Sequence, residues 1–197
     1  MSEIPFDEVR VPLFSHGWKE AIEQYSPAGR VPVLLDEGYP VWDSLAIIEY
    51  ICERHSSAVG WPDNPVERAR ARSIVAEMHS GFAAIREELP QNIRARKPCE
   101  LTDLSENCRA EIHRITEIWS KCRSKYECNG HWLFGPLSIA DIMFAPVALR
   151  FVTYDIAVES PADEFVREIQ GLEPIREWEE LSRAETEELA QIDSLRA

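Results

Sequence analysis

The feature that most constrains the fold is the stretch from residue 26 to residue 51. Residues 26–35 read SPAGRVPVLL and residues 41–51 read VWDSLAIIEYI. The Glu37-Gly38 pair between them is a turn signal between two runs of strand-forming residues, which favours a β-hairpin. The stretch therefore predicts a loop, antiparallel strands at Val31–Leu35 and Tyr39–Trp42, and a helix directly after them.

That helix is predicted over Ser44–Arg54. Leu45, Ile48 and Ile51 recur at the spacing of one helical face. Asp43 or Ser44 is expected to cap the first turn, because short oxygen-bearing side chains accept hydrogen bonds from the free N–H groups at a helix start. Ahead of the hairpin, β-forming residues predict a strand at Phe6–Leu13, and a short helix is expected at Trp18–Tyr25.

The pattern changes at residues 60–65, GWPDNP, which are typical of a linker. The patterns after it are helical, and none convincingly predicts a strand. The predicted helices are Val66 to about Arg96, Leu104–Tyr126, Ser138–Tyr154, Ala162–Gln170 and Pro174–Arg183. We expect an α/β domain at residues 1–59, a linker at 60–66 and an all-α domain at 67–197. The Glu-rich tail after Arg183 is expected to be solvated.

The charge balance narrows the classes of partner. The chain has 21 Lys and Arg against 35 Asp and Glu, a net charge of −14. Such a charge repels phosphate backbones and anionic lipid heads, so nucleic acid and membrane surfaces are not expected partners. No apolar run is long enough to span a bilayer, and no signal peptide is visible. The five cysteines include no CxxC pair, which favours reduced thiols in the cytoplasm.

Three motifs at matching distances resemble the glutathione transferase superfamily: Val31-Pro32, Asp43-Ser44 and Ser138-Ile139-Ala140-Asp141. The resemblance covers Ile4 to about Arg183. It implies a thioredoxin-like domain followed by an all-α domain, glutathione as co-substrate, a small electrophile as second substrate, and a homodimer.

At Val31-Pro32 the resemblance implies a cis peptide bond, as is usual at this point of thioredoxin-like folds. The turn would expose the N–H and C=O of Val31, which could hold the cysteinyl unit of glutathione as an added strand would. The alternative is an ordinary strand start. His16 and Arg30 flank this site, and family members often place polar or basic residues there. Both could equally be surface residues.

Asp43-Ser44 would bind the γ-glutamyl end of glutathione. A helix N-terminus has free N–H groups and a partial positive charge, so it suits a carboxylate. Ser44 would meet that carboxylate and Asp43 the neighbouring ammonium. The family often has Glu-Ser or Gln-Ser here, so Asp-Ser keeps the charge on a shorter arm. The alternative is a helix cap with no further role.

Ser138 and Asp141 form a capping-box pattern before an apolar helix, which we interpret as a folding element and not a site. Pro146 is expected to kink that helix. Met78 and Phe82, at i and i+4 on the long predicted helix, would line the electrophile pocket in the family, with core or dimer-interface packing as the alternative.

No metal is expected. Cys122, Cys128 and His131 lie close in sequence, but a metal site would need a fourth ligand and tighter geometry. The plainer interpretation of the two cysteines is ordinary buried or surface thiols.

The resemblance also implies a strand, a loop and a helix ahead of Ile4, roughly 20–25 residues by average element lengths. Three residues precede Ile4. That segment would supply the Ser, Tyr or Cys that activates the glutathione thiol, so no catalytic residue is assigned. We expect either that Met1 is internal to a longer protein or that the chain is a truncated copy. The α/β domain is therefore expected to be incomplete.

The function expected from the resemblance is a cytoplasmic glutathione transferase, acting in detoxification by conjugating glutathione to electrophiles or by glutathione-dependent isomerisation. A non-catalytic glutathione-binding or scaffold protein of the same fold is the alternative. A thioredoxin-type redox protein is disfavoured, because CxxC is missing and the helical region is large.

Overall fold

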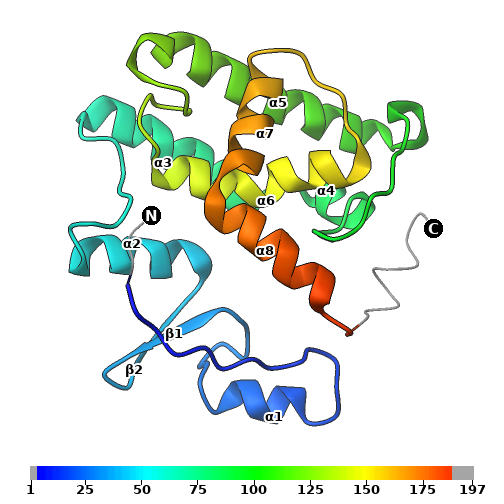
Figure 1. Ribbon diagram of the computed structural model, residues 1–197. Helices are drawn as coiled ribbons and strands as arrows, with labels where there is room; N and C mark the ends of the chain where they lie inside the picture. Colours follow the sequence, from blue (N-terminus) through cyan, green and yellow to red (C-terminus); the bar gives the residue numbers. More distant parts are fainter. Residues whose placement is uncertain (1–3, 188–197) are drawn as a thin grey trace. The chain divides into compact units, whose positions relative to one another are not determined.

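The computed structural model describes residues 4–187 of a chain that divides into two compact units, Met1–Gly60 and Trp61–Ala197. Figure 1 shows strands in the first unit and helices throughout the second. The first unit contains, in order, α1 (Trp18–Glu23), β1 (Val33–Asp36), β2 (Tyr39–Trp42) and α2 (Ser44–Arg54). The second contains α3 (Pro65–Ser80), α4 (Ala83–Glu88), η1 (Leu101–Asp103), α5 (Glu106–Tyr126), η2 (Glu127–Asn129), α6 (Ile139–Tyr154), α7 (Ala162–Gly171) and α8 (Glu173–Ala184).

The predicted hairpin is present in the first unit. Strands β1 and β2 pair in antiparallel register, with Val33 opposite Trp42 and Asp36 opposite Tyr39. Glu37 and Gly38 form the turn, both at positive φ (51° and 82°), which suits a two-residue hairpin loop. The following helix has the predicted bounds, and its N-cap is Asp43.

The predicted strand at Phe6–Leu13 is wrong. No strand is present between residues 4 and 32 of the described chain. Phe6 and Val9 have β-forming side chains, yet they are 80% and 62% exposed. A strand exists only through ladder hydrogen bonds to a neighbour, so β propensity without a partner strand does not produce one.

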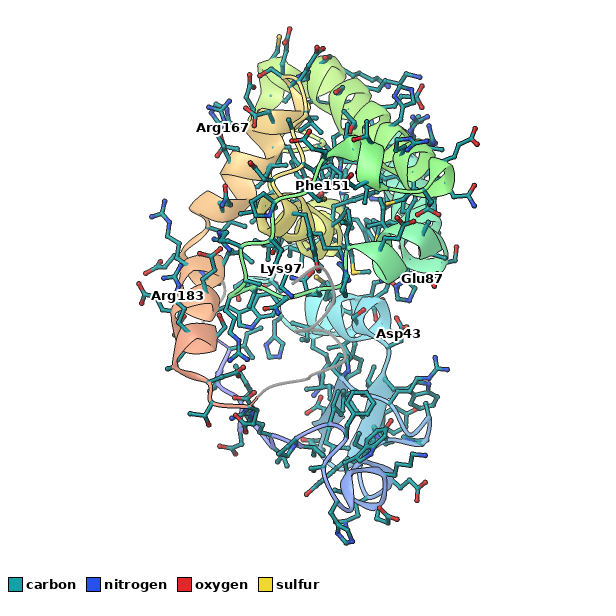
Figure 2. All side chains as sticks on the ribbon, turned by 90° about the vertical axis from the view of Figure 1, so that its right-hand side faces the viewer. Asp43, Glu87, Lys97, Phe151, Arg167 and Arg183 are labelled. Carbon is teal, nitrogen blue, oxygen red and sulfur yellow. The ribbon has the colours of Figure 1, made fainter. Side chains whose placement is uncertain are left out.

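The second unit is built around α6. Trp119 of α5 lies at its centre, fully buried, with its ring 4.9–5.9 Å from the rings of Phe144, Phe151 and Phe165. These rings come from α6 and α7, so one aromatic cluster joins three helices. Figure 2 shows Phe151 inside this helical unit. Tilted and edge-on rings at such distances pack well and add to the area that they bury.

The capping box predicted at the start of α6 is present. Asp141 Oδ2 accepts hydrogen bonds from the Ser138 N–H and hydroxyl (both 2.8 Å), and Asp141 Oδ1 accepts from the Leu133 N–H (2.8 Å). The carboxyl therefore fixes both the helix start and the loop before it. Burial raises the pKa of Asp141 to about 6, against the lowering effect of these three hydrogen bonds.

The single long helix predicted over residues 66–96 is also wrong. α3 ends at Ser80, and α4 starts at Ala83, directly after Phe82, whose φ is 56°. Gly81 permits the break, because a Cβ there would lie 2.7 Å from the Glu77 carbonyl oxygen. Residues 89–100 then run without helix.

Two glutamates join α4 to α5. Glu111 of α5 accepts hydrogen bonds from the N–H groups of Ala84 (3.3 Å) and Ile85 (2.9 Å) at the start of α4. Glu88 of α4 in turn accepts from the N–H (3.0 Å) and the hydroxyl of Ser105, the N-cap of α5. Each helix therefore supplies a carboxylate to the N-terminus of the other, where N–H groups have no partner within their own helix.

A bidentate ion pair ties α3 to α5. Arg114 Nε and Nη2 donate to the two carboxylate oxygens of Glu77 (2.7 and 2.9 Å), and Arg114 Nη1 donates to Glu117 (2.6 Å). Lys121 and then Arg114 lower the pKa of Glu117 to about 2.

Among the described helices, none is long and apolar enough to cross a membrane.

Candidate functional site

The hairpin register brings the two N-terminal motifs to one end of the hairpin. Val33 is opposite Trp42, so the preceding Val31–Pro32 and the following Asp43–Ser44 leave the ladder at the same end. The structure thus places four predicted site residues, distant in sequence, beside one another.

The loop before β1 is shaped by a residue that the sequence motifs did not reveal. Ser26 is 2% exposed; its hydroxyl accepts a hydrogen bond from the Arg30 N–H (3.2 Å), and its carbonyl accepts from the Gly29 N–H (3.0 Å). The chain then reaches the Val31–Pro32 peptide bond, which is cis, as the resemblance implied. Val31 is 46% exposed. A serine directly after a helix and before Pro-Ala-Gly was the available signal for Ser26.

Asp43, and not Ser44, caps helix α2. Asp43 Oδ1 accepts a hydrogen bond from the Leu45 N–H (3.0 Å), and the Asp43 carbonyl accepts from the Ile47 N–H (2.9 Å). Its backbone lies at φ 74° and ψ 131°, a conformation that side chains other than glycine seldom adopt. Such strained positions gather at functional sites, which makes this turn a candidate on backbone grounds alone. Figure 2 labels Asp43 at the start of α2.

The Ser44 hydroxyl is left for another partner. Ser44 is the first residue of α2 and is half-buried, and within residues 4–187 its hydroxyl makes no hydrogen bond. It stands where a helix carries a partial positive charge and N–H groups that have no partner within the helix. A carboxylate is the group that such a position suits best.

A second polar cluster fixes α2 on the hairpin. The Tyr50 hydroxyl donates to Asp36 Oδ2 (2.6 Å), and Arg54 Nη2 lies 3.3 Å from the same oxygen. The hydrogen bond to Asp36, followed by burial, raises the pKa of the Tyr50 hydroxyl. Because Asp36 is the last residue of β1, this cluster holds the strand and the helix that carry the candidate site in a fixed relation.

His16 and Arg30 are both exposed. Arg30 adjoins Val31 directly and its backbone belongs to the Ser26 loop. His16 lies in the turn before α1, and within residues 4–187 no hydrogen bond or ion pair ties its side chain to the hairpin. Arg30 therefore sits next to the candidate site along the chain, and His16 does not.

Met78 and Phe82 do not lie one turn apart on a single helix, as the sequence suggested. Met78 belongs to α3, while Phe82 is the residue before α4. Both are buried, at 4% and 9% exposure. The break at Gly81 therefore changes their spacing.

The two cysteines that lie close in sequence are in different environments. Cys122 is buried on α5 and Cys128 is exposed in η2. Burial raises the pKa of the Cys122 thiol, which makes it a weaker nucleophile at neutral pH. Residues 4–187 contain no group of three His, Cys, Asp or Glu side chains placed to hold a metal ion.

Residues 1–60 match the family "Glutathione S-transferase, N-terminal domain". The N-terminal unit is therefore a glutathione S-transferase N-terminal domain, and the whole chain has the fold of glutathione S-transferases of known structure. Its fold is correspondingly a thioredoxin-like N-terminal domain followed by an all-α domain. The sequence match is to the hairpin unit, where the Val31-Pro32 and Asp43-Ser44 motifs lie. The helical unit resembles glutathione S-transferases in fold.

Several known proteins are similar to parts of this chain in sequence or to its fold. A probable maleylacetoacetate isomerase of Caenorhabditis elegans is 33% identical over 82 residues, 42% of this chain and 38% of that protein. A glutathione S-transferase from Rhodospirillum rubrum F11 has a TM-score of 0.63 at 23% identity, with 89% of this chain and 80% of that one covered. A glutathione transferase homologue from Burkholderia gl BGR1 with bound glutathione has a TM-score of 0.60 at 23% identity, with 81% and 76% covered. The chain spans less than half the length of the curated relatives that it matches.

Proposed function

We propose that this transferase-family protein binds glutathione where the hairpin meets α2 and uses it to conjugate a small electrophile or to catalyse an isomerisation. The observation that carries the proposal is that Asp43 caps α2 while the neighbouring Ser44 hydroxyl makes no hydrogen bond within residues 4–187. Asp43 already caps α2, so the half-buried Ser44 hydroxyl beside it is spared for a ligand. A solved structural relative contains bound glutathione, which further supports this ligand.

Each proposed contact follows from the chemistry of the residue. Ser44 would donate to the α-carboxylate of the γ-glutamyl group, and Asp43 would attract the ammonium next to it. The N–H and C=O of Val31, held before Pro32, would pair with the cysteinyl unit as a neighbouring strand does. Arg30, which adjoins Val31, would lie beside the same ligand, where its positive charge suits a carboxylate.

The reaction would be a displacement or addition at carbon. The glutathione thiol loses its proton, its sulfur forms a bond to the electrophilic carbon, and any leaving group departs with the electron pair of the broken bond. A lowered thiol pKa and the close placement of both reactants would accelerate this step. Met78 and Phe82 are the residues proposed to line the electrophile site; no residue is assigned to activate the thiol. We further propose that the protein is a homodimer, which light scattering would test. It would act in the cytoplasm, in detoxification.

The second candidate is a glutathione-binding or scaffold protein without catalysis. It is favoured by one observation: the residues that match the family motifs in the hairpin unit, Val31, Pro32, Asp43 and Ser44, would account for binding of glutathione but not for activation of its thiol. Turnover of 1-chloro-2,4-dinitrobenzene with glutathione separates the two candidates. Conjugation above the uncatalysed rate supports the enzyme, and tight glutathione binding without it supports the second candidate.

Ser44→Ala tests the proposed site. Hydrogen bonds to charged groups contribute about 1.5–3 kcal/mol, so glutathione should bind roughly 10- to 150-fold more weakly. Calorimetric titration measures the Kd, and circular dichroism checks that the variant is folded. Ser57→Ala is the matched control, because Ser57 is an exposed serine of the same unit outside the site. Equal Kd values for wild type and Ser44→Ala would remove Ser44 from the site.

A further inference from the structure

Residues 89–100, between α4 and η1, contain neither helix nor strand, yet they are fixed on the last turn of α6. The Thr153 hydroxyl donates to the Asn92 carbonyl (2.9 Å), and the Thr153 carbonyl accepts from the Lys97 N–H (2.7 Å). Figure 2 labels Lys97 in this segment. The side chains of the segment therefore extend from a backbone that is held in place by the helical core.

Arg94 of this segment binds the backbone that follows α8. Its Nη1 donates to the Glu185 carbonyl and its Nη2 to the Glu187 carbonyl, both at 2.8 Å. Glu185 has an extended backbone, at φ −68° and ψ 134°. Carbonyls two residues apart lie on the same side of an extended chain, so one planar guanidinium group can bind both. Arg94 thus recognises a short extended peptide through its main chain.

Capping of α8 explains only part of this contact. A cation near a helix C-terminus is favourable, because the last carbonyls have no partner within the helix. Helix α8 ends at Ala184, and Glu185 is its C-cap. The Glu187 carbonyl lies beyond the C-cap, so the bond that it accepts from Arg94 is not a helix cap.

The two sides of the contact carry opposite charges. Residues 94–97 read RARK, whereas residues 185–188 read ETEE. Arg96 adds to the contact, since its Nη2 lies 3.8 Å from the Glu179 carboxylate on α8. Opposite charges attract one another over about 10 Å at ordinary ionic strength. The basic segment therefore favours a peptide that is acidic.

We propose that residues 94–97 form a docking site for an extended acidic peptide, and that the C-terminal segment of the same chain occupies it. Arg94 binds the main chain of residues 185–187, while Arg96 and Lys97 attract the carboxylates of that segment. The contact consists of exposed polar groups at the end of a helix, so it can open without unfolding the core. An acidic peptide added from outside should compete for the same site.

Limited proteolysis of the full chain tests whether the segment is docked. A glutamate-specific endoprotease attacks the carbonyl carbon of glutamate, so Glu187 must leave Arg94 before it is cleaved. Arg94→Gln should raise cleavage after Glu187 about tenfold or more relative to cleavage after Glu8, an exposed internal reference in the hairpin unit. Mass spectrometry measures both products. Unchanged relative cleavage in Arg94→Gln would overturn the proposal.

Two further variants separate binding of the main chain from the loss of a charge. Arg94→Lys keeps the charge but lacks the planar fork, so its cleavage should lie between that of wild type and that of Arg94→Gln. Arg167→Gln on α7 is the matched control, because it removes the same charge from an exposed side chain. It should be cleaved like wild type. Cleavage as fast as that of Arg94→Gln would overturn the proposal.

Binding of a separate peptide tests which chemistry the site takes. The triple variant Glu185→Lys/Glu187→Lys/Glu188→Lys reverses the charge of the docked segment and should empty the site in the full chain. A fluorescein-labelled peptide of residues 185–197 should bind this variant about tenfold or more tightly than wild type, whose site is occupied. Fluorescence anisotropy measures the Kd, and added salt should raise it.

The control peptide has glutamine in place of each glutamate and should bind the triple variant more weakly. Adding Arg94→Gln to the triple variant should also weaken binding of the acidic peptide about tenfold. Equal Kd values for wild type and the triple variant, or no binding by either, would overturn the proposal. So would equal binding of the acidic and the control peptide.

Light scattering separates docking within one chain from an exchange of C-terminal segments between two chains. Arg94→Gln should leave the oligomeric state unchanged. A dimer that dissociates in Arg94→Gln would place the segment on a second copy and overturn docking within the chain. None of these measurements involves glutathione, so their outcome is independent of the proposed function.

Discussion

The hairpin unit and the helical unit differ most in how much of their apolar surface is buried. Among the described residues of the hairpin unit, only Ile22 and Ser26 are buried. Seven of the eleven exposed large apolar side chains belong to this unit. In the helical unit α6 alone buries 13 of its 16 residues, whereas α2 in the hairpin unit buries none.

This contrast teaches that a helix apolar on nearly all sides, such as α6, is buried, whereas a helix with one apolar face, such as α2, need not be. Both α2 and α6 begin at a predicted Ser or Asp cap and continue with apolar residues. Burial also needs neighbouring elements, and α6 has α3 and α7 packed against it while α2 packs on two strands. The candidate glutathione site therefore lies in the unit whose own core is small, where substitutions disturb packing least.

The largest effect is expected in the helical core. Phe144→Ala removes a fully buried ring from the cluster around Trp119 and should lower the free energy of unfolding by about 3–5 kcal/mol. Denaturant unfolding followed by tryptophan fluorescence measures this. A loss below about 1 kcal/mol would mean that the cluster is loosely packed and that the contrast between the units is overstated.

A smaller effect is expected at the start of α6, and it depends on pH. Asp141→Asn keeps the size of the side chain but removes an acceptor of the Ser138 hydrogen bonds. It should lower the free energy of unfolding by about 1–3 kcal/mol. The folded pKa of about 6 lies above the ordinary 3.8, so the contribution of this carboxyl is fully present below pH 4 and is lost as pH rises through 6.

The difference in free energy of unfolding between wild type and Asp141→Asn should therefore narrow by about 1 kcal/mol or more between pH 4 and pH 7. Urea unfolding at a series of pH values measures it. Glu117, whose pKa is lowered to about 2, contributes stability that is lost as pH falls through that value, but it is present in both proteins and cancels. A gap that widens with pH would contradict the raised pKa.

The smallest effect is expected on the exposed side of the hairpin. Trp42 is 47% exposed, so Trp42→Ala should change the opening free energy of the hairpin unit by less than about 1 kcal/mol, despite the large ring. Hydrogen exchange of peptides from residues 33–54 reports on this unit separately from the helical core. A loss as large as that of Phe144→Ala would show that this face is covered in solution.

Local signals predicted much of the fold. The turn at Glu37-Gly38, the helix Ser44–Arg54 and the capping box of Ser138 and Asp141 each depend on residues within a few positions of one another, so the sequence contains the whole argument. The same holds for the neighbourhood of Val31 and Ser44, because hairpin register follows from a two-residue turn.

The errors arose where distant residues decide the structure. Whether Phe6–Leu13 becomes a strand depends on a neighbouring strand, which propensity does not encode. The break between α3 and α4 had a local signal in Gly81, but the stabilising contact comes from Glu111 on α5. Likewise, nothing near Gln91 in the sequence predicts that both of its amide atoms are buried.

The reciprocal carboxylates of Glu88 and Glu111 have a consequence for the order in which the chain folds. Helix α4 has six residues, far too few to be stable by itself in water. Its start is completed by Glu111, and the start of α5 is completed by Glu88, so neither end is finished until both helices are in place. Residues 83–111 should therefore form and open as one cooperative segment. The loop between α4 and α5 can lengthen at little entropic cost as long as the hydrogen bonds of Glu88 and Glu111 remain.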